Sequence, residues 1–200
     1  MGQFIFLRNT VNTPKHIVSP PGSHTIEMVD QYDLGTGTLS GAHGLLLSQH
    51  LDETHLCEHS NLLDTYLSQG GAVALNGPVA QPFLTPPGPY TPLPARKAKD
   101  WIVEMAEAHS IGRGVRADDL TYRRGVIGFW ARGYFEMPPG ATAITRFAAS
   151  HHAADWVWER PEGGKIFVHP GNDIWGYAGD NTTAKPLFGQ VLDWFAEGRT

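Results

Sequence analysis

The chain has 200 residues, of which 41% are hydrophobic and 18% are charged, and its formal net charge is −5. This length and composition predict a single globular domain over residues 1–200 and exclude an intrinsically disordered chain. The negative charge without a broad basic cluster argues against nucleic acid as a partner, and the apolar runs are far shorter than the ~20 residues of a membrane span.

The first residues carry neither a basic region nor a long apolar segment, so they do not resemble a secretory signal, and we expect a cytoplasmic protein. Residues 3–8 are apolar and predict a first strand. A Pro-rich polar stretch follows, and the alternation over residues 24–29 predicts a second strand. The continuous apolar run 42–48 predicts a third strand that is buried on both faces.

Residues 53–69 show helical spacing, with Leu56, Leu63 and Leu67 on one apolar stripe. Asp52 is a suitable N-cap, and the two glycines at 70–71 end the helix. Residues 72–75 then predict a short buried strand. Residues 42–76 therefore form a strand–helix–strand unit whose two strands are parallel.

Seven prolines interrupt residues 77–94, and we expect an ordered but irregular excursion over 78–94 that walls a pocket. Further strands are expected at 101–108, 142–148 and 156–159, the last pairing with 165–168, together with a loop at 120–134 that leads into a strand and a closing helix at 188–196. These elements predict an α/β three-layer sandwich of flavodoxin-like type, with a central parallel sheet and antiparallel additions. Ligands of such sheets bind beyond the carboxyl ends of the strands.

Two polar residues follow the third predicted strand. His50 and Asp52 lie at its end, beside the start of the next helix, and could act as base and orienting carboxylate or as two ligands of a divalent metal. The alternative is structural: Asp52 caps the helix and His50 bonds a loop carbonyl.

The predicted helix contains an H-x-x-E-H motif, formed by His55, Glu58 and His59. This is the inverted zincin signature, in which two histidines bind zinc and the glutamate acts as base. A zinc metallohydrolase is therefore one alternative function. The other interpretation leaves both histidines on the solvent flank of the helix, and the single cysteine, Cys57, packed as a small side chain.

Two further groups could bind a substrate. Asn76 follows the strand at 72–75 and could bond a substrate hydroxyl or amide, or could serve as a turn residue. Arg123 or Arg124, before a Gly-punctuated segment that runs to Arg132, could clamp a carboxylate or phosphate. A structural pair between such an arginine and a carboxylate is the competing interpretation.

The strand at 165–168 runs into a tight polar turn, where His169, Asn172 and Asp173 emerge together. We regard this turn as a site candidate equal to His50 and Asp52. The two consecutive histidines at 151–152 lie in a polar loop, and we expect them to be solvated.

Four stretches of the chain resemble the class I glutamine-amidotransferase-like superfamily and, within it, the trehalose-utilisation (ThuA-like) proteins. They are residues 48–50, 70–75, 109–115 and 164–173. Asn76 stands where amidotransferases have their catalytic cysteine, which excludes glutaminase chemistry by a thiolate. What the resemblance carries over is His50 and the turn at 171–173. Because ThuA-like proteins are associated with sugar metabolism, it implies a polyhydroxylated substrate.

These patterns favour a domain that binds, and as an enzyme would transform, a polar small molecule that is sugar-like or acidic. The expected chemistry is that of a hydrolase, lyase or isomerase without a cysteine nucleophile, with a divalent metal as an optional component. The expected catalytic residues are His50, Asp52, His169 and Asp173. The expected substrate-binding residues are Asn76, Arg123, Arg124 and Asn172.

A second alternative is a catalytically degenerate amidotransferase-like domain that binds a partner protein or a second copy of itself as a homo-oligomer. Exposed aromatic side chains would anchor such an interface. The aromatic residues expected there are Phe83, Tyr90, Phe129 and Trp130.

Overall fold

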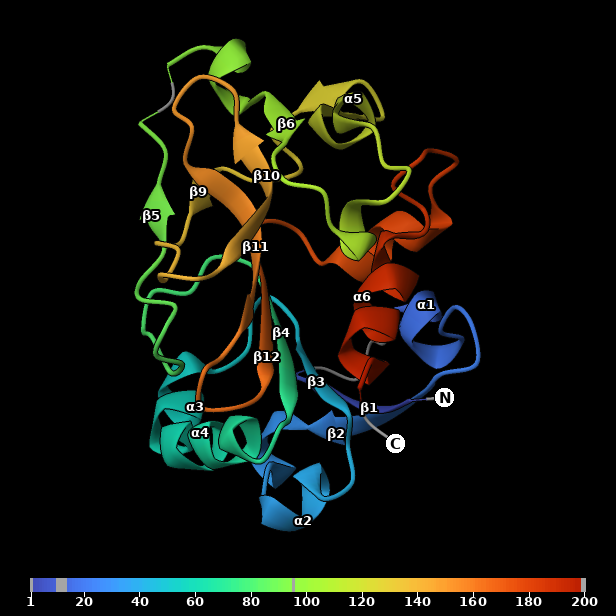
Figure 1. The fold of residues 1–200 in the computed structure, drawn as a ribbon, viewed down its shortest axis with the longest axis vertical. Helices are drawn as coiled ribbons and strands as arrows, with labels where there is room; N and C mark the ends of the chain where they lie inside the picture. The colour runs from blue at the N-terminus through green and yellow to red at the C-terminus, as the bar shows by residue number, and fades with distance from the viewer. Residues whose placement is uncertain (1, 10–13, 95, 199–200) are drawn as a thin grey trace.

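The computed structural model describes residues 2–9, 14–94 and 96–198. In these residues, eight strands form one central sheet in the order β2-β1-β3-β4-β12-β11-β10-β6, which runs through the middle of the molecule (Figure 1). The strands are β1 (Gln3–Arg8), β2 (Thr25–Asp30), β3 (Gly44–Leu47), β4 (Ala72–Asn76), β6 (Val103–Met105), β10 (Thr142–Phe147), β11 (Ala153–Glu159) and β12 (Lys165–His169).

The sheet has a parallel half and an antiparallel half. Strands β2, β1, β3, β4 and β12 are all parallel to one another. Strand β11 then pairs with β12 in antiparallel register, with Trp156 opposite Val168, and β10 and β6 continue in this manner. The expected α/β architecture, parallel at its centre with antiparallel additions, is therefore confirmed.

Helices cover both faces of the parallel half (Figure 1). Helices α1 (Lys15–Val18) and α6 (Leu187–Ala196) lie on one face, and α3 (Glu53–Glu58) and α4 (Ser60–Ser68) lie on the other. Successive side chains of a strand point to opposite faces, so each strand contributes to two cores. Phe4, Phe6, Leu46 and Ala74 face the α6 side, whereas Ile5, Leu7, Leu45 and Leu75 face the α3 and α4 side.

The predicted helix over 53–69 is interrupted in the structure. The backbone of His59 leaves helical geometry, with φ −102° and ψ 10°, and separates α3 from α4. The apolar stripe survives this break, since Leu56, Leu63 and Leu67 are all buried. Asp52 caps α3 as expected, because its side chain accepts a hydrogen bond from the His55 amide.

The predicted strand over 101–108 is wrong in its length. Trp101 belongs to the short 3-10 helix η2 (Ala98–Trp101), and only β6 pairs regularly with β10. The amides of Ala106 and Glu107 still donate to carbonyls of β10 beyond β6, at 2.9 Å and 3.1 Å. On the other side of β10, its register with β11 shifts around Thr145, which is the mark of a β-bulge.

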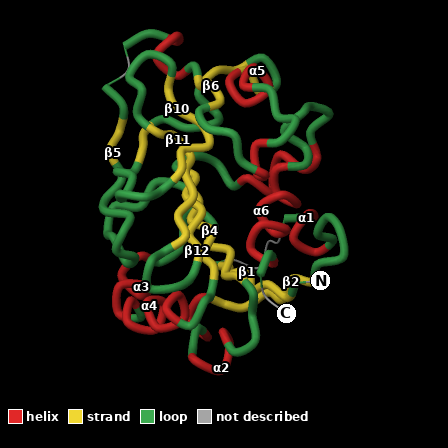
Figure 2. The backbone as a smooth tube through the Cα atoms, in the orientation of Figure 1, coloured by secondary structure: helices red, strands yellow, loops and turns green. Residues whose placement is uncertain are grey.

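Most of the chain between β4 and β10 is loop (Figure 2). It contains the small ladders of β5 (Thr91–Pro92) with β9 (Gly133–Tyr134) and of β7 (Tyr122–Arg123) with β8 (Val126–Ile127), and the helix α5 (Ala117–Thr121). The Pro-rich excursion is irregular, as its composition predicted. No helix among the described residues is long and apolar enough to cross a membrane. The remaining helix, α2 (Thr36–Leu39), precedes β3.

Candidate functional site

The carboxyl ends of three adjacent parallel strands, β3, β4 and β12, are tied together by hydrogen bonds. The Gln49 amide, after β3, donates to Oδ1 of Asp173, after β12, at 2.9 Å. The Gly77 amide, after β4, donates to the His169 carbonyl at 2.9 Å. A Cβ on Gly77 would lie 2.6 Å from that of Gln49, and its φ of +86° also favours glycine. The polar residues that follow these strands therefore do gather at one edge of the sheet.

Asn76 lies at the centre of this edge and is 1% exposed. Its Nδ2 donates to the Leu47 carbonyl at 3.1 Å, and its Oδ1 accepts from the Ile174 amide at 3.2 Å. The side-chain amide thus joins the end of β3 to the segment after β12. This geometry gives Asn76 a structural role at the position where the resemblance expects a nucleophile.

His169 is completely buried at the end of β12. Its Nδ1 lies 2.5 Å from Oδ1 of Asp155, and its Nε2 lies 2.7 Å from the Asn172 carbonyl oxygen. The ring also packs against Trp130, with ring centroids 4.4 Å apart. Because both nitrogens face oxygen acceptors inside the protein, neither is available to a ligand.

Asp155, on β11, is the centre of the buried network around His169. Its Oδ2 accepts from Nε1 of Trp130 at 2.6 Å and from the hydroxyl of Thr145. The network therefore connects β10, β11, β12 and the loop that contains Trp130. Such satisfied buried networks specify one packing arrangement, because each unpaired member would be costly.

His50 and Asp52 do not act on each other in the structure. The His50 side chain is exposed, its φ is +71°, and its carbonyl accepts a hydrogen bond from the Asn9 side chain. Asp52 caps α3 and accepts from the Tyr32 hydroxyl at 3.1 Å. The hydrogen bonds from the His55 amide and from Tyr32 hold the pKa of Asp52 below its ordinary value. The geometry therefore fits the structural interpretation of Asp52.

Asp173 is the carboxylate at the sheet edge with the strongest electrostatic perturbation. Burial raises its pKa from 3.8 to about 6, against the opposing effect of the hydrogen bond from the Gln49 amide. Loss of hydration disfavours the charged carboxylate, which explains the direction.

Arg123 and Arg124 are engaged in a pair with Asp180, which is the structural alternative weighed from the sequence. Arg123 Nε donates to Asp180, and its Nη2 donates to the Gly176 carbonyl at 2.7 Å. Arg124 Nη2 donates to the other Asp180 oxygen at 3.2 Å. Burial alone would raise the pKa of Asp180, but these two arginines outweigh it and lower the value.

The histidines of the H-x-x-E-H motif bond to backbone carbonyls. His55 Nε2 lies 2.9 Å from the Gln31 carbonyl oxygen, and His59 Nδ1 lies 2.9 Å from the His55 carbonyl oxygen. Glu58 is exposed. No group of three or more His, Cys, Asp or Glu side chains that could hold a metal ion occurs in residues 2–9, 14–94 and 96–198.

A pocket of about 340 Å³ opens beside the tied strand ends, and we call it the strand-end pocket. Its size is at the lower end of the range for small-molecule sites. One wall comes from the three strand ends, with Gln49, Pro78, Pro170, Gly171 and Asn172. The rest of the lining comes from Tyr90 in the Pro-rich excursion and from Gly128, Phe129, Ala131 and Arg132.

The aromatic residues of the strand-end pocket differ in exposure. Phe129 is 40% exposed at the rim. Tyr90 is half-buried, and a Cβ on Gly133 would lie 2.4 Å from its hydroxyl oxygen, so this glycine makes room for the ring. Burial raises the pKa of Tyr90, while the nearby charge of Arg132 opposes this rise. An exposed aromatic ring and a guanidinium therefore line the same pocket.

The expected set of exposed aromatic anchors needs correction. Phe83 is 4% exposed and Trp130 is 2% exposed, so both belong to the core. Trp130 is buried because its ring covers His169 and its Nε1 bonds to Asp155. Of the four side chains, Phe129 is the exposed one and Tyr90 is half-buried.

The sequence did not predict Arg132 or Gln49 as binding residues, and it predicted Phe129 only as an interface anchor. A signal for Arg132 was present, because it lies in a Gly-punctuated loop segment, where binding residues are frequent. The sequence predicted Arg123 and Arg124 as the anion-binding residues, and the structure shows that both form ion pairs with Asp180.

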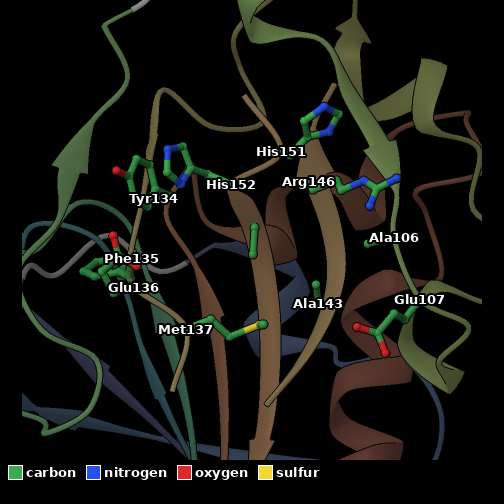
Figure 3. Close-up of a pocket in the computed structure, with 11 residues that line it drawn as sticks. Ala106, Glu107, Tyr134, Phe135, Glu136, Met137, Ala143, Arg146, His151 and His152 are labelled. Atoms are coloured by element: carbon green, nitrogen blue, oxygen red, sulfur yellow. The ribbon is translucent and has the colours of Figure 1, made fainter. Parts of the chain in front are cut away.

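A second pocket, of about 370 Å³, lies on the antiparallel half of the sheet (Figure 3). Figure 3 shows His151 and Arg146 near each other on one side and Glu107 below them. His152, expected to be solvated, is exposed but stacks flat on Tyr134, with ring centroids 3.9 Å apart. Side chains of both charges line this pocket, so its charge favours no single ligand class.

No protein-family model and no curated protein sequence matches this chain. Among solved structures, a cytoplasmic protein from Salmonella typhimurium is similar over 97% of this chain and 98% of its own, with a TM-score of 0.65 and 10% identity. A ThuA-like protein from Bacteroides uniformis is similar over 98% of this chain and 91% of its own, with a TM-score of 0.53 and 9% identity.

This chain shares the fold of these two proteins. At 9–10% identity the likeness extends to the fold alone, since one fold hosts many functions. The ThuA-like architecture implied by the sequence resemblance is therefore confirmed, whereas amidotransferase chemistry receives no support from it.

Proposed function

We propose that this chain binds a polar small molecule in the strand-end pocket. The observation that carries the proposal is the position of the pocket, beyond the carboxyl ends of β3, β4 and β12. Open α/β sheets bind their ligands at this place because the loops after parallel strands converge there. The hydrogen bonds among these loops support a rigid wall.

The lining of the strand-end pocket suits a hydroxylated ligand. Phe129 offers an apolar ring face, while Gln49 and Asn172 offer amide groups that donate and accept hydrogen bonds. The ThuA-like neighbour is consistent with a sugar-related ligand at most, and the cytoplasmic neighbour is consistent with the location expected from the sequence.

The proposal concerns binding and assigns no reaction. Among the described lining residues of the strand-end pocket there is no carboxylate, imidazole or thiol. A proton shuttle through His169 would have to break its two internal hydrogen bonds. Acid–base chemistry, an optional divalent metal and a homo-oligomer stay predictions of the sequence.

Isothermal titration calorimetry with D-glucose, D-gluconate, citrate and D-glucose 6-phosphate tests the proposal. At least one compound should bind, and Phe129→Ala should weaken that binding by about two- to tenfold, because packing on an aromatic ring is worth ~0.5–1.5 kcal/mol. Tyr122→Ala is the matched control, since Tyr122 is 46% exposed and lies outside the pocket lining. Two results would contradict the proposal. One is binding that Phe129→Ala leaves unchanged, and the other is no binding by any of the four compounds at a ligand concentration of ~10 mM.

A further inference from the structure

Arg132 gives the strand-end pocket its charge. Among the described residues that line the pocket, it is the one with a full charge. No carboxylate within residues 2–9, 14–94 and 96–198 forms an ion pair with it. Other arginines of the loops and strands around the site differ in this respect. Arg123 and Arg124 are paired with Asp180, and Arg146 is paired with Glu104. An uncompensated guanidinium beside a pocket favours an anion.

The exposed Arg132 is anchored to its own loop by a hydrogen bond. Its Nε donates to the Gly128 carbonyl at 3.1 Å, and its Cζ lies 5.9 Å from the centroid of the Trp101 ring. The hydrogen bond uses the Nε–H of the group. The terminal amino groups remain for a ligand, in the geometry that binds two oxygens of one carboxylate or phosphate.

Phe129 and Asn172 line the same pocket as Arg132. Phe129 is adjacent to Gly128, and the Asn172 Nδ2 donates to the Phe129 carbonyl at 3.3 Å, which fixes the amide beside the ring. The Oδ1 of Asn172 is then left to accept from a ligand hydroxyl. A cation, a ring face and an oriented amide oxygen thus occur together.

The second pocket provides an internal comparison. Its lining includes Glu107 and Glu136 together with Arg146, so negative side chains there oppose an anion. The strand-end pocket has no such carboxylate among its described lining residues. The difference in charge makes the strand-end pocket the better site for an anionic ligand.

We infer that the ligand of the strand-end pocket is a hydroxylated molecule that carries an oxyanion, either a carboxylate or a phosphate, which Arg132 binds. This inference rests on the proposed function and narrows it to a ligand class. Arg132 replaces Arg123 and Arg124 as the expected anion-binding residue, because those two arginines form ion pairs with Asp180.

The test compares D-gluconate, D-glucose 6-phosphate and D-glucose by calorimetry at constant ionic strength. We expect at least one of the two anions to bind tenfold or more tightly than D-glucose. Arg132→Gln should reduce that affinity at least tenfold without changing the affinity for D-glucose, and Arg132→Lys should restore part of it. Arg116→Gln is the control for the loss of one positive charge, because Arg116 is exposed and lies outside the pocket.

The possible results separate the two proposals. D-glucose binding as tightly as both anions, or an anion affinity that Arg132→Gln does not alter, would overturn the inference and leave the proposed function intact. No binding of any of these three compounds or of citrate would overturn both. A preference for D-gluconate identifies the oxyanion as a carboxylate, and a preference for D-glucose 6-phosphate identifies it as a phosphate; both results support the role of Arg132.

Discussion

Replacing Asp173 by asparagine should stabilise the protein at neutral pH. The Asp173 carboxylate accepts the Gln49 amide at 2.9 Å, and an asparagine carbonyl can accept the same hydrogen bond. The substitution therefore keeps the link between the ends of β3 and β12. What it removes is the negative charge, whose burial raises the pKa of this group to about 6.

The magnitude follows from linkage between proton binding and folding. The folded chain holds the Asp173 proton more tightly than the unfolded chain, where the pKa is the ordinary 3.8. Between pH 4 and pH 6 the unfolded state loses its proton first, so stability falls as the pH rises and the loss is complete above pH 6. The full difference in pKa corresponds to about 3 kcal/mol. Since Asp173 keeps some exposure, we expect about 2 kcal/mol.

Urea denaturation of the wild type and of Asp173→Asn from pH 4 to pH 8 measures this effect. The variant should be about 2 kcal/mol more stable at pH 7.5, which corresponds to a rise in Tm of about 4–8 °C for a chain of this size, and the advantage should shrink towards pH 4. Asp33→Asn is the control, because the side chain of Asp33 is exposed. An advantage that is absent at pH 7.5, or that has the same size at pH 4 and pH 7.5, would refute the reasoning.

Three further substitutions test the structural roles assigned above. Asn76→Ala should lower the free energy of unfolding by about 2–4 kcal/mol, because it leaves a buried carbonyl and a buried amide unpaired. A loss of less than ~0.5 kcal/mol in chemical denaturation would contradict the structural role of Asn76. In Gly171→Ala the new Cβ would lie 1.5 Å from the Trp130 carbonyl oxygen, and we expect a loss of more than about 2 kcal/mol by calorimetric melting, with an unchanged Tm as the contrary result. Thr145→Val removes the hydroxyl that donates to Asp155 and should cost about 1–3 kcal/mol, whereas Thr145→Ser should recover most of it; equal stability of the two variants would show that the hydroxyl is unimportant.

Local sequence patterns predicted most of the fold. Continuous apolar runs and alternating strands located β1, β2, β3, β4 and β12, because both signals come from which faces of a strand are buried. The break at His59 and the short β6 were not predictable in this way. The His59 ring bonds the His55 carbonyl one turn earlier. The extent of β6 depends on its pairing with β10, which is distant in sequence.

The sequence predicted where polar residues gather in the fold, but not which of them are bonded to other parts of the chain. The sequence by itself determined that polar residues follow β3, β4 and β12, and the topology of parallel strands brings these ends to one edge. Only the tertiary structure decided which of these polar side chains are engaged in hydrogen bonds or ion pairs within the protein. The ring nitrogens of His169 bond to Asp155 and to the Asn172 carbonyl. Asp180 forms ion pairs with Arg123 and Arg124. Arg132 lines the pocket without an ion pair among the described residues. Apart from Asn172, these partners are distant in sequence. Whether a polar side chain is free depends on what the folded chain places within hydrogen-bonding distance of it.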